Sequence, residues 1–143
     1  MCFVAWHRAS RENVLQSPRA RRFHSSTSVL VFDELAYRLL LALIRDRYEG
    51  SPLDRLRDDE ETLLAELAPQ VTAQLDRLFE LPHLEVVDVL GSDVAAMNDA
   101  MTPYRLRPRD ALHLAVMQRL GCRNLASTDH HFDRAPHIVR YAV

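Results

Sequence analysis

The segment from Arg107 to Asp133 constrains the fold of this chain more than any other stretch of its sequence. It contains an apolar helix that begins near Pro108, then a short apolar strand, and Asp129 just after that strand. Proline fits the first position of a helix, which places Asp110 at about the third position, where the helix dipole favours a negative charge. Helix starts and strand ends meet at one edge of an α/β sheet. We therefore expect these acids to lie close together.

The same alternation of helices and short apolar strands continues through the rest of the chain. This pattern predicts a parallel sheet with helices on both faces, and 143 residues suit one domain with a single core. Proline, glycine and polar residues mark the boundaries between the elements. We expect a turn at 24–26, a helix within 27–50, a helix from Leu53, a further helix from Pro69 to Pro82, a strand within 83–90, a helix after a Ser92 cap, and strands at 124–128 and 137–143.

Composition excludes several classes of protein. No apolar run approaches the roughly 20 residues that a membrane span needs, and the opening residues do not resemble a secretory signal, so we expect a cytoplasmic protein. The two cysteines make no disulfide framework. All 18 basic residues are arginine, which removes Schiff-base and P-loop lysine chemistry. Five arginines precede Asp33 against one acid; this part either contacts a phosphate backbone or is a solvated face.

Two further acids are candidates for the same site. Glu34 lies where a short apolar stretch becomes a helix, and Asp133 lies four residues after Asp129. Each acid taken alone also fits a helix-start, turn or solvated loop residue. Three or four converging carboxylates would repel each other unless a cation lay between them. Such clusters favour Mg²⁺ or Mn²⁺, which support phosphodiester hydrolysis.

Other motifs for catalysis are weak. His130 and His131 are adjacent, so their rings cannot easily face one ion, and no zinc-binding spacing occurs. His113, three residues after Asp110, either packs within its helix or reaches the edge of the site. A serine-hydrolase elbow and a glycine-rich phosphate loop are both absent from the sequence.

Two segments of the sequence resemble a known family. LRPRDALHLAVMQRLGCRNLASTDHHFDRAP is similar to the carboxyl-terminal half of PIN domains, particularly the VapC-like toxins, and TSVLVFDELAYRLL is similar to their second strand and the helix that carries a glutamate. The resemblance spans roughly residues 18–143. It implies a three-layer α/β fold around a parallel sheet and a Mg²⁺- or Mn²⁺-dependent ribonuclease site. By this resemblance Glu34, Asp110, Asp129 and Asp133 would coordinate metal and orient the attacking water, with Thr128 beside them.

The chain departs from the family pattern at its beginning. PIN domains normally open with a strand that ends in an aspartate, and here no aspartate precedes Asp33. We therefore expect a single, amino-terminally truncated PIN-like domain over 1–143 that lacks the first strand and one metal ligand. An unpaired strand edge would then be open to pairing with another chain.

Three functions remain open at this stage. The first is a metal-dependent ribonuclease that cleaves RNA and is inhibited by a small antitoxin protein, with a homodimer expected by resemblance. The second is a non-catalytic PIN remnant that binds RNA or a partner protein. The third is an α/β interaction module whose acids are incidental.

Overall fold

The structure is a computed structural model, which describes residues 4–8 and 23–142. These residues form two compact units. The first contains the described residues up to Val29 together with those from His83 onward, and the second is Leu30–Pro82. Most of the arginine-rich amino-terminal stretch lies outside the described residues.

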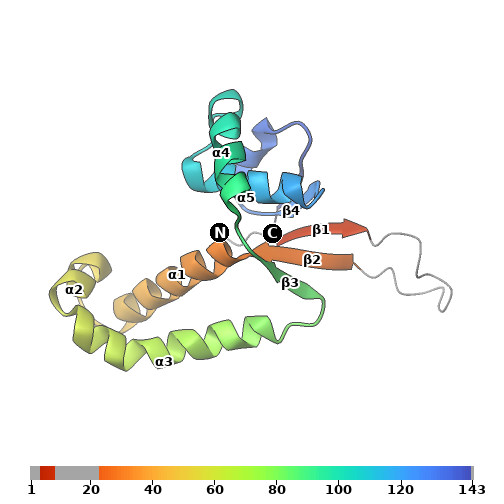
Figure 1. Ribbon diagram of the computed structural model, residues 1–143. Helices are drawn as coiled ribbons and strands as arrows, with labels where there is room; N and C mark the ends of the chain where they lie inside the picture. Colours follow the sequence, from red (N-terminus) through yellow and green to blue (C-terminus); the bar gives the residue numbers. More distant parts are fainter. Residues whose placement is uncertain (1–3, 9–22, 143) are drawn as a thin grey trace. The chain divides into compact units, whose positions relative to one another are not determined.

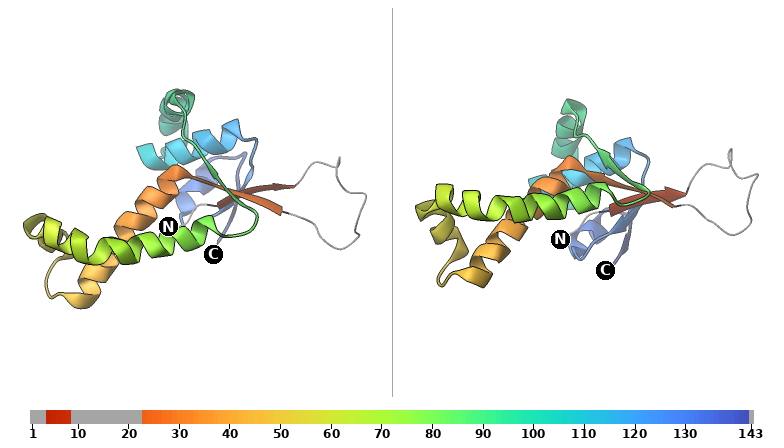
Figure 2. Two further views of the ribbon diagram at one scale, coloured as in Figure 1. Left: turned by 60° about the horizontal axis from the view of Figure 1, so that its bottom comes forward. Right: turned by 90° about the horizontal axis from the view of Figure 1, so that it is seen from below.

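The first unit is built on a five-stranded sheet with the order β3-β2-β1-β4-β5. The pairs β2–β3 and β4–β5 are parallel, as the sequence predicts, whereas β1 is antiparallel to both of its neighbours. Figure 2 shows β1 and β2 side by side. The sheet is therefore mixed, within the predicted α/β class. The strands are β1 (Val4–Arg8), β2 (Phe23–Ser28), β3 (Leu84–Val87), β4 (Asn124–Ala126) and β5 (Val139–Tyr141).

The expectation that the first strand is missing is wrong. Residues 4–8 form β1, which lies in the middle of the sheet and pairs Ala5 with both Ser26 and Leu125. Backbone hydrogen bonding explains the difference, because a strand between β2 and β4 satisfies the donors and acceptors of both in whichever direction it runs. The edges of β2 and β4 that face each other are thus both paired with β1.

The predicted turn at 24–26 is also wrong, because these residues belong to β2. Serine seldom marks a buried strand, yet Ser26 and Ser28 are buried beside Thr27. The strand pairs in parallel with β3, from Ser25 opposite Leu84 to Ser28 opposite Val87. Pairing on both sides of β2 outweighs the weak strand propensity of its sequence.

Three helical elements complete the first unit: α4 (Gly91–Tyr104), α5 (Pro108–Arg119) and the 3₁₀ helix η2 (His130–Arg134). Helix α5 is buried along most of its length, and with β2, β3 and β4 it lines one small cavity. Helix α4 begins earlier than predicted, since Leu90 and not Ser92 is its cap. The Leu90 N–H donates to the carboxylate of Asp93 at 2.8 Å.

The second unit is a helical hairpin of α1 (Val29–Arg47, whose first residue belongs to the first unit), α2 (Pro52–Asp58) and α3 (Glu60–Phe79). Figure 1 shows α1 and α3 lying alongside each other, with α2 at the end where they are connected. Their contact is a cluster of buried apolar side chains, and Phe32 stacks on Phe79 at 4.3 Å between ring centroids. The buried cluster consists of Leu40, Ile44, Leu63, Leu67 and Val71.

The predicted helix boundary at Pro69 is wrong, because α3 continues through that residue. A proline inside a helix costs about 3 kcal/mol. Leu67 and Val71 on either side of it are both buried in the hairpin core, and burial of such side chains returns about 1.5 to 3 kcal/mol each. The break falls instead at Asp59, between α2 and α3. Among the described residues, no helix has the length and apolar character to cross a bilayer.

Candidate metal centre

Asp110 lies in the first turn of α5. Pro108 occupies the start of this helix, and the Ala111 N–H donates to the carbonyl of Arg107 at 2.9 Å, which closes the first turn. Asp110 is therefore at the third helical position, as predicted, where the helix dipole stabilises its negative charge. Its side chain is only 7% exposed. The helix start favours the ionised form of this carboxylate, and a nearby cation would favour it further.

Asp129 lies where the chain leaves β4 and enters η2. The Asp129 N–H donates to the Ser127 hydroxyl at 3.0 Å, and Asp129 caps η2 by accepting from the His131 N–H at 2.9 Å. Asp129 is 7% exposed, like Asp110. The turn interpretation of Asp129 is confirmed by this cap, and the second carboxylate oxygen leaves room for a further role.

The side chains of Asp110, Asp129 and His131 come together at this edge of the first unit. Each offers one ligand atom, and these atoms all lie within 4.8 Å of one another. His131 Nδ1 is 2.9 Å from Asp129 Oδ1. The predicted convergence of Asp110 and Asp129 is therefore present in the structure, with a histidine added.

Hydrogen bonding and packing hold η2 against the start of α5. Phe132 is fully buried, so one side of η2 is anchored in the core. Arg134 Nη1 donates to the carbonyl of Arg105, the residue that ends α4, at 2.7 Å. The end of η2 is thus hydrogen-bonded to the loop that precedes α5.

Glu34 belongs to the second unit, in the second turn of α1. Its Oε1 accepts from Arg38 at 2.9 Å. Its side chain is 12% exposed, and the buried Oε2 has no hydrogen-bond partner among the residues that the structure describes. Glu34 thus carries a buried oxygen whose coordination is incomplete, and its predicted role as a metal ligand stays a prediction.

Asp133 lies in η2 but is not grouped with Asp110, Asp129 and His131. Both of its carboxylate oxygens accept from Arg140, at 2.8 and 2.9 Å, and its side chain is 55% exposed. The hydrogen bonds from Arg140 hold the pKa of Asp133 below its usual value. Its predicted role as a ligand is untested, and in this structure its charge is already balanced by an arginine.

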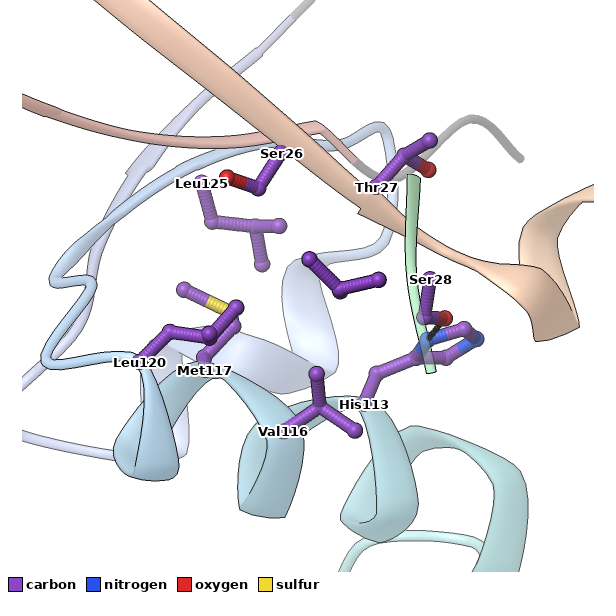
Figure 3. Close-up of a pocket in the computed structure, with 9 residues that line it drawn as sticks. Ser26, Thr27, Ser28, His113, Val116, Met117, Leu120 and Leu125 are labelled. Carbon is purple, nitrogen blue, oxygen red and sulfur yellow. Dashed lines mark hydrogen bonds between the residues drawn. The ribbon is translucent and has the colours of Figure 1, made fainter. Parts of the chain in front are cut away.

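His113 packs within the first unit. The side chain is buried, and its Nδ1 lies 3.3 Å from the Ser28 hydroxyl; both residues line the small cavity and contact each other at its wall, as Figure 3 shows. Val116, Met117 and Leu125 line the same cavity. Burial, with a smaller contribution from Arg109, lowers the pKa of His113 to about 4. The interpretation of His113 as a packed, hydrogen-bonded histidine is confirmed, and the residue is neutral at pH 7.

His131 is the member of the cluster that sequence reasoning missed. Adjacent histidines do not both face one ion, and here His131 alone of the two joins the acids. The signal was present in the spacing Asp-x-His after a strand. An aspartate that caps the following turn folds residue i+2 back toward its own carboxylate, which is the contact that Asp129 and His131 make.

The donor set fits a divalent metal ion. Asp110 and Asp129 are acceptors with little access to water, and two such carboxylates favour a cation between them. Carboxylate oxygens are the donors that Mg²⁺ and Mn²⁺ bind. With the ion, this chemistry supports hydrolysis at a phosphodiester.

Comparison with protein families gives one result. The family model described as PIN domain matches residues 2–138 of the chain. No curated protein and no solved structure matches the sequence of this chain.

Proposed function

The chain belongs to the PIN domain family, whose members are generally nucleases, and from this premise we propose that it hydrolyses RNA phosphodiester bonds with a divalent metal ion. The observation that carries the proposal is the buried pair Asp110 and Asp129 at a helix start and a strand end. Glu34 is proposed as a third carboxylate ligand, by resemblance and because its Oε2 is buried without a partner among the described residues.

The proposed ligands are held before any ion binds. Asp110 is fixed by the first turn of α5, and Asp129 by its cap on η2, so neither carboxylate needs to be ordered by the metal. Mg²⁺ or Mn²⁺, when bound, would neutralise negative charge on the phosphodiester and lower the pKa of water. Asp110 and Asp129 are each only 7% exposed, so little water reaches either residue.

The test is cleavage of RNA by the full chain with Mg²⁺ or Mn²⁺, with single-stranded DNA as a second substrate. Asp110→Asn keeps the shape of the side chain and removes its charge, so we expect cleavage to fall by more than about a hundredfold, beyond the loss typical of an outer-shell change. Asp99→Asn is the matched control, because Asp99 is exposed on α4, and it should cleave as the wild type does. Metal-dependent cleavage that survives Asp110→Asn would contradict the proposal.

Two further variants test which of Glu34 and Asp133 is the third carboxylate ligand. Glu34→Gln should lose activity to the same degree as Asp110→Asn if Glu34 is a ligand. Asp133→Asn should lower cleavage by less than about tenfold, because Asp133 would have to leave Arg140 before it could bind metal. A large loss for Asp133→Asn, with a small one for Glu34→Gln, would assign the third carboxylate to Asp133.

A toxin role is a finer proposal, which rests on the resemblance of residues 106–136 to VapC-like sequences. A toxin of this kind would be inhibited by a small antitoxin protein, and it would act as a homodimer by resemblance. Induced expression in bacteria should then stop growth, and Asp110→Asn should relieve the arrest. Growth that continues in the presence of active wild-type enzyme would contradict the toxin role and leave the nuclease proposal standing.

The alternative is a PIN protein that binds RNA without cleaving it. One observation favours it, namely the lack of any aspartate before Asp33, where the family has a ligand. This alternative predicts RNA binding that is equal in wild type and Asp110→Asn, with no cleavage in either protein at any metal concentration.

A further inference from the structure

His131 changes the chemistry of the cluster from oxygen alone to oxygen and nitrogen. The ligand atoms of Asp110, Asp129 and His131 lie within 4.8 Å of one another. Two ligands of one metal ion with bonds of about 2.1 Å can be at most about 4.2 Å apart. The 2.9 Å between His131 Nδ1 and Asp129 Oδ1 falls within that limit, and the His131 side chain is 28% exposed, which leaves its ring room to turn toward an ion.

Mg²⁺ and first-row transition ions differ in their response to such a nitrogen. Mg²⁺ takes oxygen ligands and loses its waters reluctantly. Imidazole is a good ligand for transition ions, and their affinity for mixed nitrogen and oxygen sites rises from Mn²⁺ toward Cu²⁺. A site with one imidazole and two carboxylates therefore favours a transition ion over Mg²⁺.

We propose that His131 is a direct ligand of the metal at the Asp110–Asp129 site, and that this nitrogen makes the site selective for a first-row transition ion over Mg²⁺. The inference rests on the proposed nuclease site and goes beyond it by naming a ligand and an order of metal preference. The geometry that carries it is the fold of η2, in which Asp129 caps the turn and brings residue i+2 back to its own carboxylate.

The experiment measures metal binding on the full chain and does not depend on catalysis. Wild type and His131→Ala are titrated calorimetrically with Mn²⁺ and with Mg²⁺, and the Mn²⁺-loaded proteins are examined by pulsed electron paramagnetic resonance for coupling to a histidine nitrogen. We expect His131→Ala to lose at least about tenfold in Mn²⁺ affinity and about twofold or less in Mg²⁺ affinity. The nitrogen coupling should be present in wild type and absent from the variant.

His130 supplies the matched control. Its ring centroid lies 4.5 Å from that of His131, so His130→Phe removes an imidazole that lies outside the cluster and keeps an aromatic ring against His131. This variant should bind both ions as the wild type does and should keep the nitrogen coupling. Thermal melting checks that each variant is folded; if His131→Ala does not fold, the coupling and the ratio of Mn²⁺ to Mg²⁺ affinity in wild type still decide the proposal.

Two results would overturn this inference. One is an equal loss of affinity for both ions in His131→Ala, which would mean that His131 only positions Asp129. The other is wild-type protein that binds Mn²⁺ without nitrogen coupling. The nuclease proposal fails separately: a coupled, selectively bound Mn²⁺ with no RNA cleavage would contradict the nuclease and leave the ligand assignment intact.

Discussion

His113 is a buried titratable group that the proposed site does not use. It lies one turn after Asp110 on α5, and it contacts Ser28 on the neighbouring strand β2. Burial disfavours its charged form, which lowers the pKa to about 4 from an ordinary 6.5. The neutral ring is therefore a packing element, and its protonation destabilises the fold next to the site.

The pH dependence of stability should report this residue. Between pH 6.5 and 4 the unfolded chain binds a proton at His113 and the folded chain does not, so the free energy of unfolding falls as the pH is lowered. A shift from 6.5 to about 4 corresponds to about 3 kcal/mol at 1.36 kcal/mol per pKa unit. From pH 7 to pH 4, the free energy of unfolding of His113→Gln should therefore fall by about 3 kcal/mol less than that of the wild type. Urea unfolding at the two pH values measures this difference.

Two controls separate His113 from other groups that titrate in this range. Ser28→Ala keeps the ring buried, so its pH dependence should match that of the wild type. His130→Phe removes an exposed histidine, and the change in its free energy of unfolding between pH 7 and pH 4 should also match that of the wild type. If His113→Gln and wild type have parallel stability profiles, the ring is protonated in the folded protein and the assignment is wrong.

At the scale of elements, one ion pair ties α4 to the helix that carries Asp110. Arg119 Nε, near the end of α5, donates to Asp93 Oδ1 at 2.9 Å, and Arg119 Nη2 donates to the carbonyl of Asp88 at 2.6 Å. Asp93 is almost fully buried, and it also accepts from the Leu90 N–H at the start of α4. Burial raises the pKa of Asp93, but the hydrogen bonds from Arg119 and Leu90 outweigh it, so the pKa lies below its usual value.

Removal of this carboxylate should destabilise the protein substantially. Asp93→Ala leaves a partly buried Arg119 without its anion and the Leu90 N–H at the start of α4 without its acceptor, and we expect a loss of about 2 to 3 kcal/mol. Asp46→Ala is the control, since Asp46 pairs with Arg45 on the surface and should cost less than about 1 kcal/mol. The measurement is denaturant unfolding at pH 7. Similar losses in the free energy of unfolding for the two variants would show that the buried ion pair contributes no more to stability than the surface pair.

Local sequence signals predicted the helices better than the strands. Proline is favoured at the first position of a helix and glycine just after its end. The predicted start of α5 and end of α1 therefore lie close to the observed boundaries. Residues 24–26 of β2 are polar and predict a turn, because the pairing of this strand with β1 and β3 depends on residues far away in sequence. Strand β1 was missed for the same reason. Tertiary pairing decides such segments, and local propensity does not record it.

The candidate site was predictable to the extent that its members lie at element ends. Asp110 and Asp129 follow from a helix start and a strand end, and the structure brings them together. Asp133 is only four residues from Asp129, yet it turns to Arg140 because η2 is a 3₁₀ helix, in which residues i and i+4 do not share a face. Side-chain direction in a single short turn is beyond what spacing in the sequence determines.

At the scale of the whole molecule, the chain has two compact units, each with its own buried residues. The hairpin Leu30–Pro82 buries Leu40, Ile44, Leu63 and Leu67 in one cluster, all from within that range. The first unit buries Leu125 and other apolar side chains of its sheet and helices. Units that close their own cores can open separately, as cooperative blocks with different stabilities.

We expect core substitutions to act on the unit that contains them. Leu67→Ala should lower the stability of the hairpin by about 2 to 5 kcal/mol, because Leu67 is fully buried. Amide hydrogen exchange followed by mass spectrometry should then show faster exchange in α1 and α3, with a smaller change in α5 and β4. Leu125→Ala is the matched control from the first unit and should give the reverse pattern. Equal acceleration in both units, for both variants, would mean that the chain opens as one block. The stability of the segment that carries Glu34 would then be inseparable from that of the segment that carries Asp110 and Asp129.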